Sequence, residues 1–315
     1  MSNILLAIMG LDAKAWEERF RALAPGHEIW SWPESFGDPA MMDYACVWNP
    51  PTGLLAQFPN LKAIFSLGAG VDDLLADPKL PDVPVVRIVD SDMTMRMTEY
   101  VTLHVLMCHR RQRLYVGQQR QRLWRDHEQP AANEIGVGVM GLGELGSHSA
   151  SLLHRLGFRV AGWSRTGKAP PGVEAFSGPA GLEPFLRRTE ILVCLLPLTA
   201  ATREILNLAL FRKLKYNGTL QGAYVINAGR GALQVDGDII EALDEGTLAG
   251  AVLDVFSTEP LPLASPLWTH PKVTITPHNA AVSEPRAIVR NVVRQIDRCE
   301  LGVGLQHAVD RETGY

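Results

Sequence analysis

The chain has 315 residues, of which 46% are hydrophobic and 20% are charged, and its formal net charge is −4. This length suits two domains, and the composition is that of a globular protein with large buried cores. A slightly acidic chain has no basic field to hold nucleic acid. No apolar run reaches the roughly 18 residues that a membrane span needs, so neither nucleic acid nor membrane is an expected partner.

The cysteines point to a reducing compartment. There are four of them, none in a CxxC pair: Cys46, Cys108, Cys194 and Cys299. We interpret them as reduced, buried thiols and predict a cytoplasmic protein without a metal site.

Strand and helix patterns alternate along the first part of the chain. Residues 4–9 are apolar but too short for a signal sequence, and they predict a strand. A helix is expected over residues 13–23, followed by a short apolar segment around 46–48 and by strands over 63–67 and 84–88. This alternation is typical of parallel sheets with crossover helices.

One long helix is expected from about residue 98 to 124, because Met97, Val101, Val105 and Cys108 recur at helical spacing. Its second half is basic and contains Arg110, Arg111, Arg113, Arg120, Arg122 and Arg125. Two interpretations stay open: a solvated or subunit-contacting face, and a phosphate contact.

A second set of strands begins at Ile135, with further strands expected over 159–163, 191–196, 224–227, 251–255 and 273–276. The last helix is expected over residues 284–301. Residues 1–98 and 283–315 therefore flank one middle domain, 99–282, and we expect the two ends to join into one lobe. Small ligands usually bind in a cleft between such lobes.

The middle domain opens with the motif of a dinucleotide site. A strand ending at Met140 runs into Gly141-Leu142-Gly143-Glu144-Leu145-Gly146 and then a helix, which is GxGxxG in its proper context. The first glycine permits a tight turn, the second lets the backbone approach a pyrophosphate, and the third lets helix and strand pack closely. The alternative is an ordinary glycine-rich turn.

The second strand of this domain ends without the acidic residue that an NAD site places at the ribose 2′-OH. It is followed instead by Ser164, Arg165, Thr166 and Lys168. A guanidinium suits a 2′-phosphate, so the sequence predicts NADP(H) over NAD(H). The alternative for Arg165 is an exposed surface arginine.

Three further segments follow predicted strands and bring Arg230, Glu259 and His278 to the ligand edge of the sheet. Arg230 can bind the carboxylate of a 2-keto acid and polarise its carbonyl. His278 can donate a proton to the carbonyl oxygen as a general acid, with Glu259 orienting its ring. Singly each residue has a structural explanation; together, behind a GxGxxG, they predict hydride transfer between a nicotinamide and a small 2-keto acid.

These motifs resemble those of the D-isomer-specific 2-hydroxyacid dehydrogenases over nearly the whole chain. Within that family the chain is most similar to the short bacterial glyoxylate/hydroxypyruvate reductases of the A type. The matching segments include Asn227–Gly231, Asp254–Pro260 and Pro277–His278, besides the glycine motif. The resemblance implies a Rossmann domain inserted in a flavodoxin-like substrate domain, and NADPH-dependent reduction of glyoxylate to glycolate and hydroxypyruvate to D-glycerate.

The resemblance also implies residue roles. Arg230, Glu259 and His278 would be catalytic; Trp48 and the backbone N–H groups of Ala69 and Gly70 would bind substrate with Arg230 and His278; and Asp254 would contact the nicotinamide carboxamide. The full set expected at the cofactor is Gly141, Gly143, Glu144, Leu145, Gly146, Ser164, Arg165, Thr166, Lys168, Pro197, Thr202, Ala228 and Asp254. A homodimer through the cofactor domain and its long helix is implied as well.

Two departures and several alternatives stay open. Residues 215–221 look longer than the usual turn, and Asn279 stands where relatives have an apolar residue.

The alternatives within the fold are a dehydrogenase for a bulkier 2-keto acid and a phosphoglycerate or formate dehydrogenase. Formate has no carbonyl oxygen to protonate, and a Gln would be expected in place of Glu259. A non-catalytic NADP(H)-sensing protein and an assembly scaffold are the alternatives outside enzymes.

Overall fold

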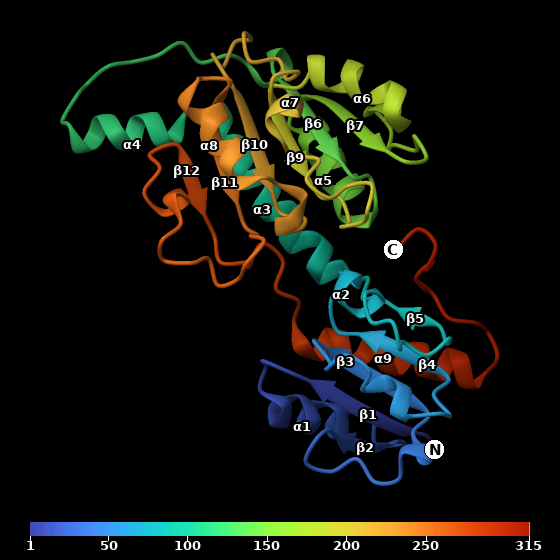
Figure 1. The fold of residues 1–315 in the computed structure, drawn as a ribbon. Helices are drawn as coiled ribbons and strands as arrows, with labels where there is room; N and C mark the ends of the chain where they lie inside the picture. Colours follow the sequence, from blue (N-terminus) through green and yellow to red (C-terminus); the bar gives the residue numbers. More distant parts are fainter. Residues whose placement is uncertain (315) are drawn as a thin grey trace. The chain divides into compact units, whose positions relative to one another are not determined.

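The computed structural model describes residues 1–314 and divides the chain into two compact units. One contains residues 1–93 together with the chain from Ser283 onwards, and the other is Thr94–Val282. The covalent connections between them lie within one helix near its start, and in the loop before the last helix. Both units are α/β, as the sequence predicts (Figure 1).

The first unit is built on a parallel sheet with the strand order β2-β1-β3-β4-β5. The strands are β1 (Asn3–Ile8), β2 (Glu28–Ser31), β3 (Tyr44–Trp48), β4 (Ala63–Ser66) and β5 (Val85–Val86). This order is that of flavodoxin-like sheets. Its helices are α1 (Ala13–Leu23), α2 (Asp72–Leu75) and α9 (Pro285–Glu300), and α1 packs against α9.

The second unit has a parallel sheet with the order β12-β11-β10-β9-β6-β7-β8. Its strands are β6 (Gly136–Met140), β7 (Arg159–Ser164), β8 (Glu174–Ser177), β9 (Ile191–Cys194), β10 (Ala223–Asn227), β11 (Leu248–Leu253) and β12 (Val273–Ile275). The chain order reverses between β6 and β9, which is the switch point of a Rossmann sheet and the place where dinucleotides bind.

Helices cover both faces of the second sheet. They are α3 (Ser91–His109), α4 (Gln112–Arg120), α5 (Glu144–Arg155), α6 (Gly178–Arg187), α7 (Leu208–Phe211) and α8 (Asp236–Asp244). Strand side chains alternate between two buried cores: Ile191 and Val193 pack with α3 and α5, whereas Leu192 and Cys194 pack with α6, α7 and α8. Because both faces are covered, these strands are apolar throughout, and that is why the sequence predicts them.

The single helix predicted over 98–124 is wrong in two respects. Helix α3 begins at Ser91, and the helical stretch breaks at Arg111, whose φ of +53° is left-handed. The Arg111 side chain donates to the carbonyl of Thr219 at 3.0 Å, and Arg113 donates to Thr274 Oγ1 at 2.7 Å. These two arginines therefore attach the start of α4 to the loop before β10 and to strand β12 of their own unit, which neither interpretation of the basic half foresaw.

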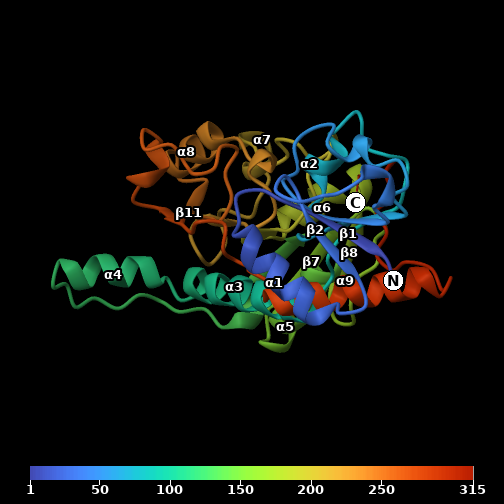
Figure 2. The ribbon, with the colours of Figure 1, turned by 90° about the horizontal axis from the view of Figure 1, so that it is seen from below.

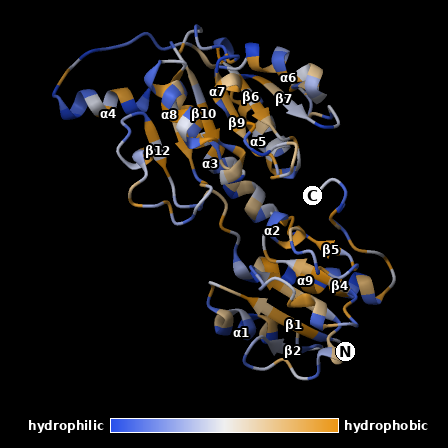
Figure 3. Cartoon of the chain, in the orientation of Figure 1, coloured by the Kyte–Doolittle hydropathy of each residue, from blue (hydrophilic) through white to orange (hydrophobic). Residues whose placement is uncertain are grey.

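Beyond this break, α4 projects from the β12 side of the sheet and the chain returns alongside it (Figures 1 and 2). Hydrogen bonds link the two legs, from Gln118 to His127 at 2.7 Å and from Gln129 to Tyr115 at 3.4 Å. Arg120, Arg122 and Arg125 are exposed here. Figure 3 shows that this arm, residues 112–130, is mostly hydrophilic, with a few apolar residues among the polar ones.

Three cysteines, Cys46, Cys108 and Cys194, are buried free thiols, and burial raises the thiol pKa of Cys108 and of Cys194 to about 12. Cys299 is partly exposed, so the prediction that all four are buried is wrong for this one. Over residues 1–314, the structure contains no helix that is both long and apolar enough to cross a membrane.

Candidate active site

The glycine motif forms the turn between β6 and α5. Gly141 has a φ of +97°, which a residue with a Cβ rarely adopts. A Cβ on Gly146 would overlap the carbonyl oxygen of Gly141, whereas a Cβ on Gly143 would have no atom within 4 Å. The turn thus needs the first and third glycines for its own packing and leaves open space at the second, beside the exposed Glu144 and half-buried Leu145 that begin α5. This fits a pyrophosphate at a helix N-terminus.

The residues predicted to read the ribose follow β7 directly. Ser164 ends the strand, and its hydroxyl accepts a hydrogen bond from the Gly167 N–H at 3.2 Å. Arg165, Thr166 and Lys168 are exposed on the turn after it. Since β7 neighbours β6, this turn lies at the same edge of the sheet as the glycine motif.

Two more predicted cofactor residues stand in the loop after β9. Thr202 Oγ1 donates to the carbonyl of Pro197 at 2.7 Å and accepts from the Thr199 N–H at 2.8 Å. These bonds fold residues 197–202 into a compact turn beyond the carboxyl end of the strand. Ala228, immediately after β10, is buried.

Arg230 is carried by a loop that Asn227 organises from its buried position at the end of β10. The Asn227 side chain accepts from the Gly229 N–H at 3.1 Å and donates to the Arg230 carbonyl at 3.0 Å and to Gln234 Oε1 at 2.8 Å. The guanidinium donates to the Gly229 carbonyl at 2.9 Å. Gln234 is 3% exposed and was missed by the sequence analysis, because an isolated glutamine after a loop has no pattern of its own.

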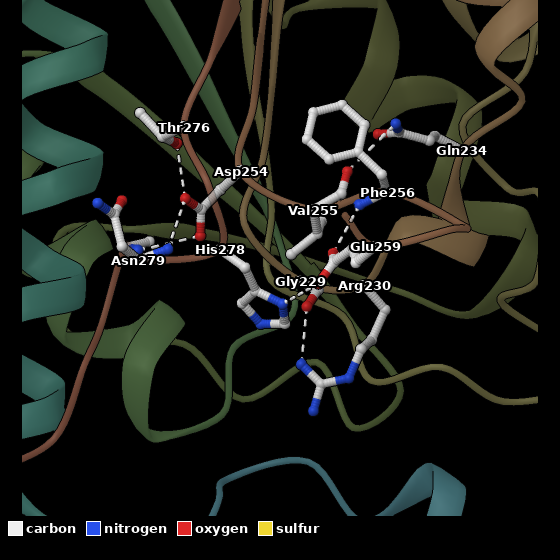
Figure 4. Close-up of polar contacts among 11 residues, drawn as sticks. Gly229, Arg230, Gln234, Asp254, Val255, Phe256, Glu259, Thr276, His278 and Asn279 are labelled. Carbon is white, nitrogen blue, oxygen red and sulfur yellow. Dashed lines mark hydrogen bonds and ion pairs between the residues drawn. The ribbon is translucent and has the colours of Figure 1, made fainter. Parts of the chain in front are cut away.

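Glu259 and His278 form a hydrogen-bonded pair, with 2.7 Å between His278 Nδ1 and Glu259 Oε2 (Figure 4). The other carboxylate oxygen of Glu259 accepts from the Phe256 N–H at 2.9 Å. An ionised carboxylate only accepts, so we assign the proton to Nδ1, which leaves Nε2 directed away from the glutamate. Figure 4 shows the Arg230 guanidinium on the same side of the sheet edge as this imidazole.

Asp254 lies behind the pair and is 1% exposed. Its Oδ1 accepts from Thr276 Oγ1 at 2.6 Å and from the Asn279 N–H at 3.0 Å, and its Oδ2 accepts from the Ala280 N–H at 3.0 Å. Its carbonyl accepts from the His278 N–H at 2.8 Å. The Asn279 amide lies on the far side of the Asp254 carboxylate from the imidazole (Figure 4).

The predicted substrate residues Trp48, Ala69 and Gly70 belong to the first unit, where Trp48 ends β3 and the other two follow β4. The indole packs against Gly68, where a Cβ would come within 2.7 Å of its ring. The hydroxyl of Ser66 accepts from the Gly68 N–H at 3.2 Å, and Ala69 and Gly70 are partly exposed. The structure therefore places these residues together at the carboxyl ends of neighbouring strands.

The long loop at 215–221 precedes β10, so it lies at the amino end of that strand, opposite the edge that carries Arg230. Lys215 forms an ion pair of 2.9 Å with the buried carboxylate of Glu190, and Arg111 holds the Thr219 carbonyl. Within its unit the loop therefore lies at the opposite edge of the sheet from Arg230, Glu259 and His278.

A dinucleotide turn and an Arg, a Glu and a His at one edge of a parallel sheet define an oxidoreductase that transfers hydride through a nicotinamide cofactor. Residues 102–280 match the NAD-binding domain of the D-isomer specific 2-hydroxyacid dehydrogenases. A glyoxylate/hydroxypyruvate reductase A of Yersinia enterocolitica is 41% identical over 99% of this chain and 100% of its own length. The chain therefore belongs to the D-isomer specific 2-hydroxyacid dehydrogenase family.

Two solved structures agree with this. An NADPH-dependent glyoxylate/hydroxypyruvate reductase of Sinorhizobium meliloti, in complex with NADP and sulfate, is 44% identical with a TM-score of 0.94, and 100% of both chains is covered. A family member from Xanthobacter autotrophicus, in complex with NADPH and MES, is 40% identical with a TM-score of 0.94 and covers 100% of this chain and 99% of its own.

Proposed function

We propose that this protein reduces small 2-keto acids with NADPH, converting glyoxylate to glycolate and hydroxypyruvate to D-glycerate. The observation that carries the proposal is that one unit, Thr94–Val282, holds both the dinucleotide turn and the Arg230, Glu259 and His278 set at one sheet edge. The names of the Yersinia and Sinorhizobium relatives support the choice of substrates.

The chain's residues fit NADP(H). The open space at Gly143 and the start of α5 suit the pyrophosphate, and Arg165 with Lys168 suits a 2′-phosphate. Structures of two relatives contain NADP or NADPH, which supports the same preference here. We assign residues 94–282 to cofactor binding, and residues 1–93 with the chain from Ser283 onwards to substrate binding.

When bound, NADPH supplies the hydride that is added to the carbonyl carbon. His278 donates the proton from Nε2 to the carbonyl oxygen, so that a hydroxyl forms as the carbon is reduced. Glu259 holds the ring through Nδ1 and stabilises the imidazolium before transfer. The products are the 2-hydroxy acid and NADP⁺, and His278 takes up a proton from water to complete the cycle.

Arg230 binds the oxygens of the substrate. Its guanidinium presents parallel N–H groups to the carboxylate and the adjacent carbonyl, which neutralises the charge that grows on the oxygen. We propose that the backbone N–H groups of Ala69 and Gly70 bind the same carboxylate and that Trp48 lines the pocket. Thr202, Ala228 and Asp254 complete the cofactor side.

We also propose that the protein is a homodimer in the cytoplasm. The buried free thiols suit a reducing compartment, and exposed apolar side chains on α3 and α4 supply a surface for a second copy.

The test is NADPH oxidation with glyoxylate and with hydroxypyruvate, with NADH in parallel assays. We expect turnover with NADPH and a loss of about 10²–10⁴ in kcat in His278→Ala. His270→Ala is the matched control, because His270 also faces a carboxylate, that of Asp244 at 3.4 Å, but lies at the amino end of β12.

Turnover confined to bulkier 2-keto acids would keep the reaction and change the substrate. NADPH binding without turnover of any 2-keto acid would refute the proposed reaction and favour a sensing role.

A further inference from the structure

A chain of two hydroxyl groups runs from helix α3 to the buried aspartate behind the catalytic pair. The Tyr100 hydroxyl lies 2.8 Å from Thr276 Oγ1, and Thr276 Oγ1 lies 2.6 Å from Asp254 Oδ1. Tyr100 and Thr276 are 176 residues apart in the sequence and belong to the same unit. None of the motifs assigns either side chain a role.

The direction of these hydrogen bonds is fixed by chemistry. The Asp254 carboxylate accepts from two backbone N–H groups and has no proton to donate. The Thr276 hydroxyl must therefore donate its one proton to Oδ1. Thr276 Oγ1 can then only accept from Tyr100. The tyrosine suits that part, because burial raises its phenol pKa and keeps the proton in place, and its ring packs on His104 at 4.3 Å between centroids.

The aspartate in turn fixes the segment that carries the general acid. Asp254 contacts three consecutive residues, since its carbonyl accepts from the His278 N–H and its two oxygens accept from Asn279 and Ala280. His278 has a φ of +51°, an unfavourable backbone conformation for a residue with a Cβ. The segment therefore depends on these bonds to keep the imidazole against Glu259.

We propose that Thr276 and Tyr100 are positioning residues for the reaction: they hold the Asp254 carboxylate in the orientation that binds the backbone N–H groups of the two residues directly after His278. Neither side chain contacts the Nδ1–Glu259 hydrogen bond, so both act through Asp254. The inference rests on the proposed function, because it assigns the proton transfer to His278.

The experiment compares three substitutions with two matched controls in the full-length protein. Thr276→Val keeps the side-chain shape and removes the hydroxyl, Thr276→Ser keeps the hydroxyl, and Tyr100→Phe removes only the donor to Thr276. Thr274→Val is the control for the first, because Thr274 lies two residues before Thr276, on β12, and binds Arg113 instead. Tyr224→Phe, at the amino end of β10, is the control for the tyrosine.

We expect Thr276→Val to lower kcat about tenfold, because a donor to a buried charged group is lost. Tyr100→Phe should lower it by about threefold, since the Thr276 bond to Asp254 survives. Thr276→Ser should keep kcat within about twofold of the unchanged protein, and both controls should stay in the same range. The KM for the keto acid and the Kd for NADPH, measured by fluorescence, should change by less than about threefold throughout.

Several results would overturn this inference. One is a kcat of Thr276→Val within twofold of the unchanged protein, and another is a Thr276→Ser variant as slow as Thr276→Val. Weaker NADPH binding with unchanged kcat would show that the two hydroxyl groups support cofactor binding rather than the position of His278. Absence of turnover in the unchanged protein would instead refute the proposed function, so the two failures are distinguishable.

Discussion

The residues of the candidate site are of two kinds. The role of some can be predicted from the neighbouring sequence, whereas the role of others depends on partners that only the fold brings close. Gly141, with its φ of +97°, is predicted from the motif because its requirement is a property of its own turn. Thr276 and Tyr100 depend on a contact across 176 residues, which no local pattern encodes. Gln234 belongs with them, because its structural role is visible only from the hydrogen bond that its side-chain oxygen accepts from the Asn227 amide.

Arg165 carries the prediction about cofactor choice. Replacing it with alanine should raise the KM for NADPH by about 10–100-fold, because a charge-assisted contact to a phosphate is worth about 1.5–3 kcal/mol. The KM for NADH should change little, since the 2′-OH offers no such charge. The measurement is KM for both cofactors at saturating glyoxylate.

Arg187→Ala is the control for this experiment, because Arg187 is an exposed arginine that pairs with Glu183 on α6. Equal losses with NADPH and NADH in Arg165→Ala would show that Arg165 supports the fold rather than the 2′-phosphate.

At the scale of elements, strong apolar periodicity predicts that a helix or strand exists, but it predicts the first and last residues of that element poorly. Helix α1 and the strands of the second sheet other than β8 lie close to their predicted positions because their buried residues dominate the pattern. The short strands β2 and β8 were missed; both carry exposed residues and lie at sheet edges. The break between α3 and α4 was missed because it is stabilised by Arg111 and its distant partner Thr219.

The end of helix α9 is attached to its sheet by Glu300. Its Oε1 accepts from the Tyr44 hydroxyl at 2.6 Å and from Ser2 Oγ at 3.1 Å, and Lys62 Nζ lies 3.3 Å away. The hydrogen bond from Tyr44 lowers the pKa of Glu300 below its usual value. The folded state therefore binds its proton less readily than the unfolded state does, and stability rises with pH across the interval between the two pKa values.

Glu300→Gln should accordingly be less stable than the unchanged protein at neutral pH. The difference should be less than about 1 kcal/mol, because the side chain is partly exposed, and it should vanish as the pH falls through the lowered pKa of Glu300. Urea unfolding at neutral and acidic pH measures it. Glu18→Gln, on the exposed face of α1, is the control, and a difference that persists in acid would contradict the assignment.

For the whole molecule, the two-sheet architecture follows from the alternation of strands and helices, and the family assignment follows from the motifs. The sequence predicts the interruption of one unit by the other, because the last helix has no strand of the middle sheet after it. The side chains of the proposed substrate pocket cannot be predicted in the same way, since the loops after β3 and β4 that are proposed to form it have no motif of comparable strength.

Assembly is the prediction at this scale. Leu103 and Leu106 on α3 are 54% and 36% exposed, and Trp124 in the arm is fully exposed. Leu103 and Leu106 are three residues apart on α3 and therefore lie on one face of the helix. Exposed apolar side chains on one face mark association surfaces, so we expect a particle of twice the 34.6 kDa chain mass. Sedimentation velocity should show the dimer dissociating in a Leu103→Glu, Leu106→Glu double variant.

Met41→Glu, at a similarly exposed methionine of the first unit, should remain dimeric. A monomeric unchanged protein, or dissociation by the Met41 control alone, would contradict the assignment of the interface to α3 and the arm.

The placement of Arg230, Glu259 and His278 in the same unit as the glycine turn has a consequence for descent. The proposed proton donor His278 and the glycine turn proposed to bind the hydride carrier NADPH are encoded by one uninterrupted stretch, residues 94–282. The proposed substrate residues Trp48, Ala69 and Gly70 lie in residues 1–93. Under this proposal, replacements in residues 1–93 can alter which keto acid is accepted while the reaction stays the same. Substrate specificity can then change in evolution independently of the catalysed reaction.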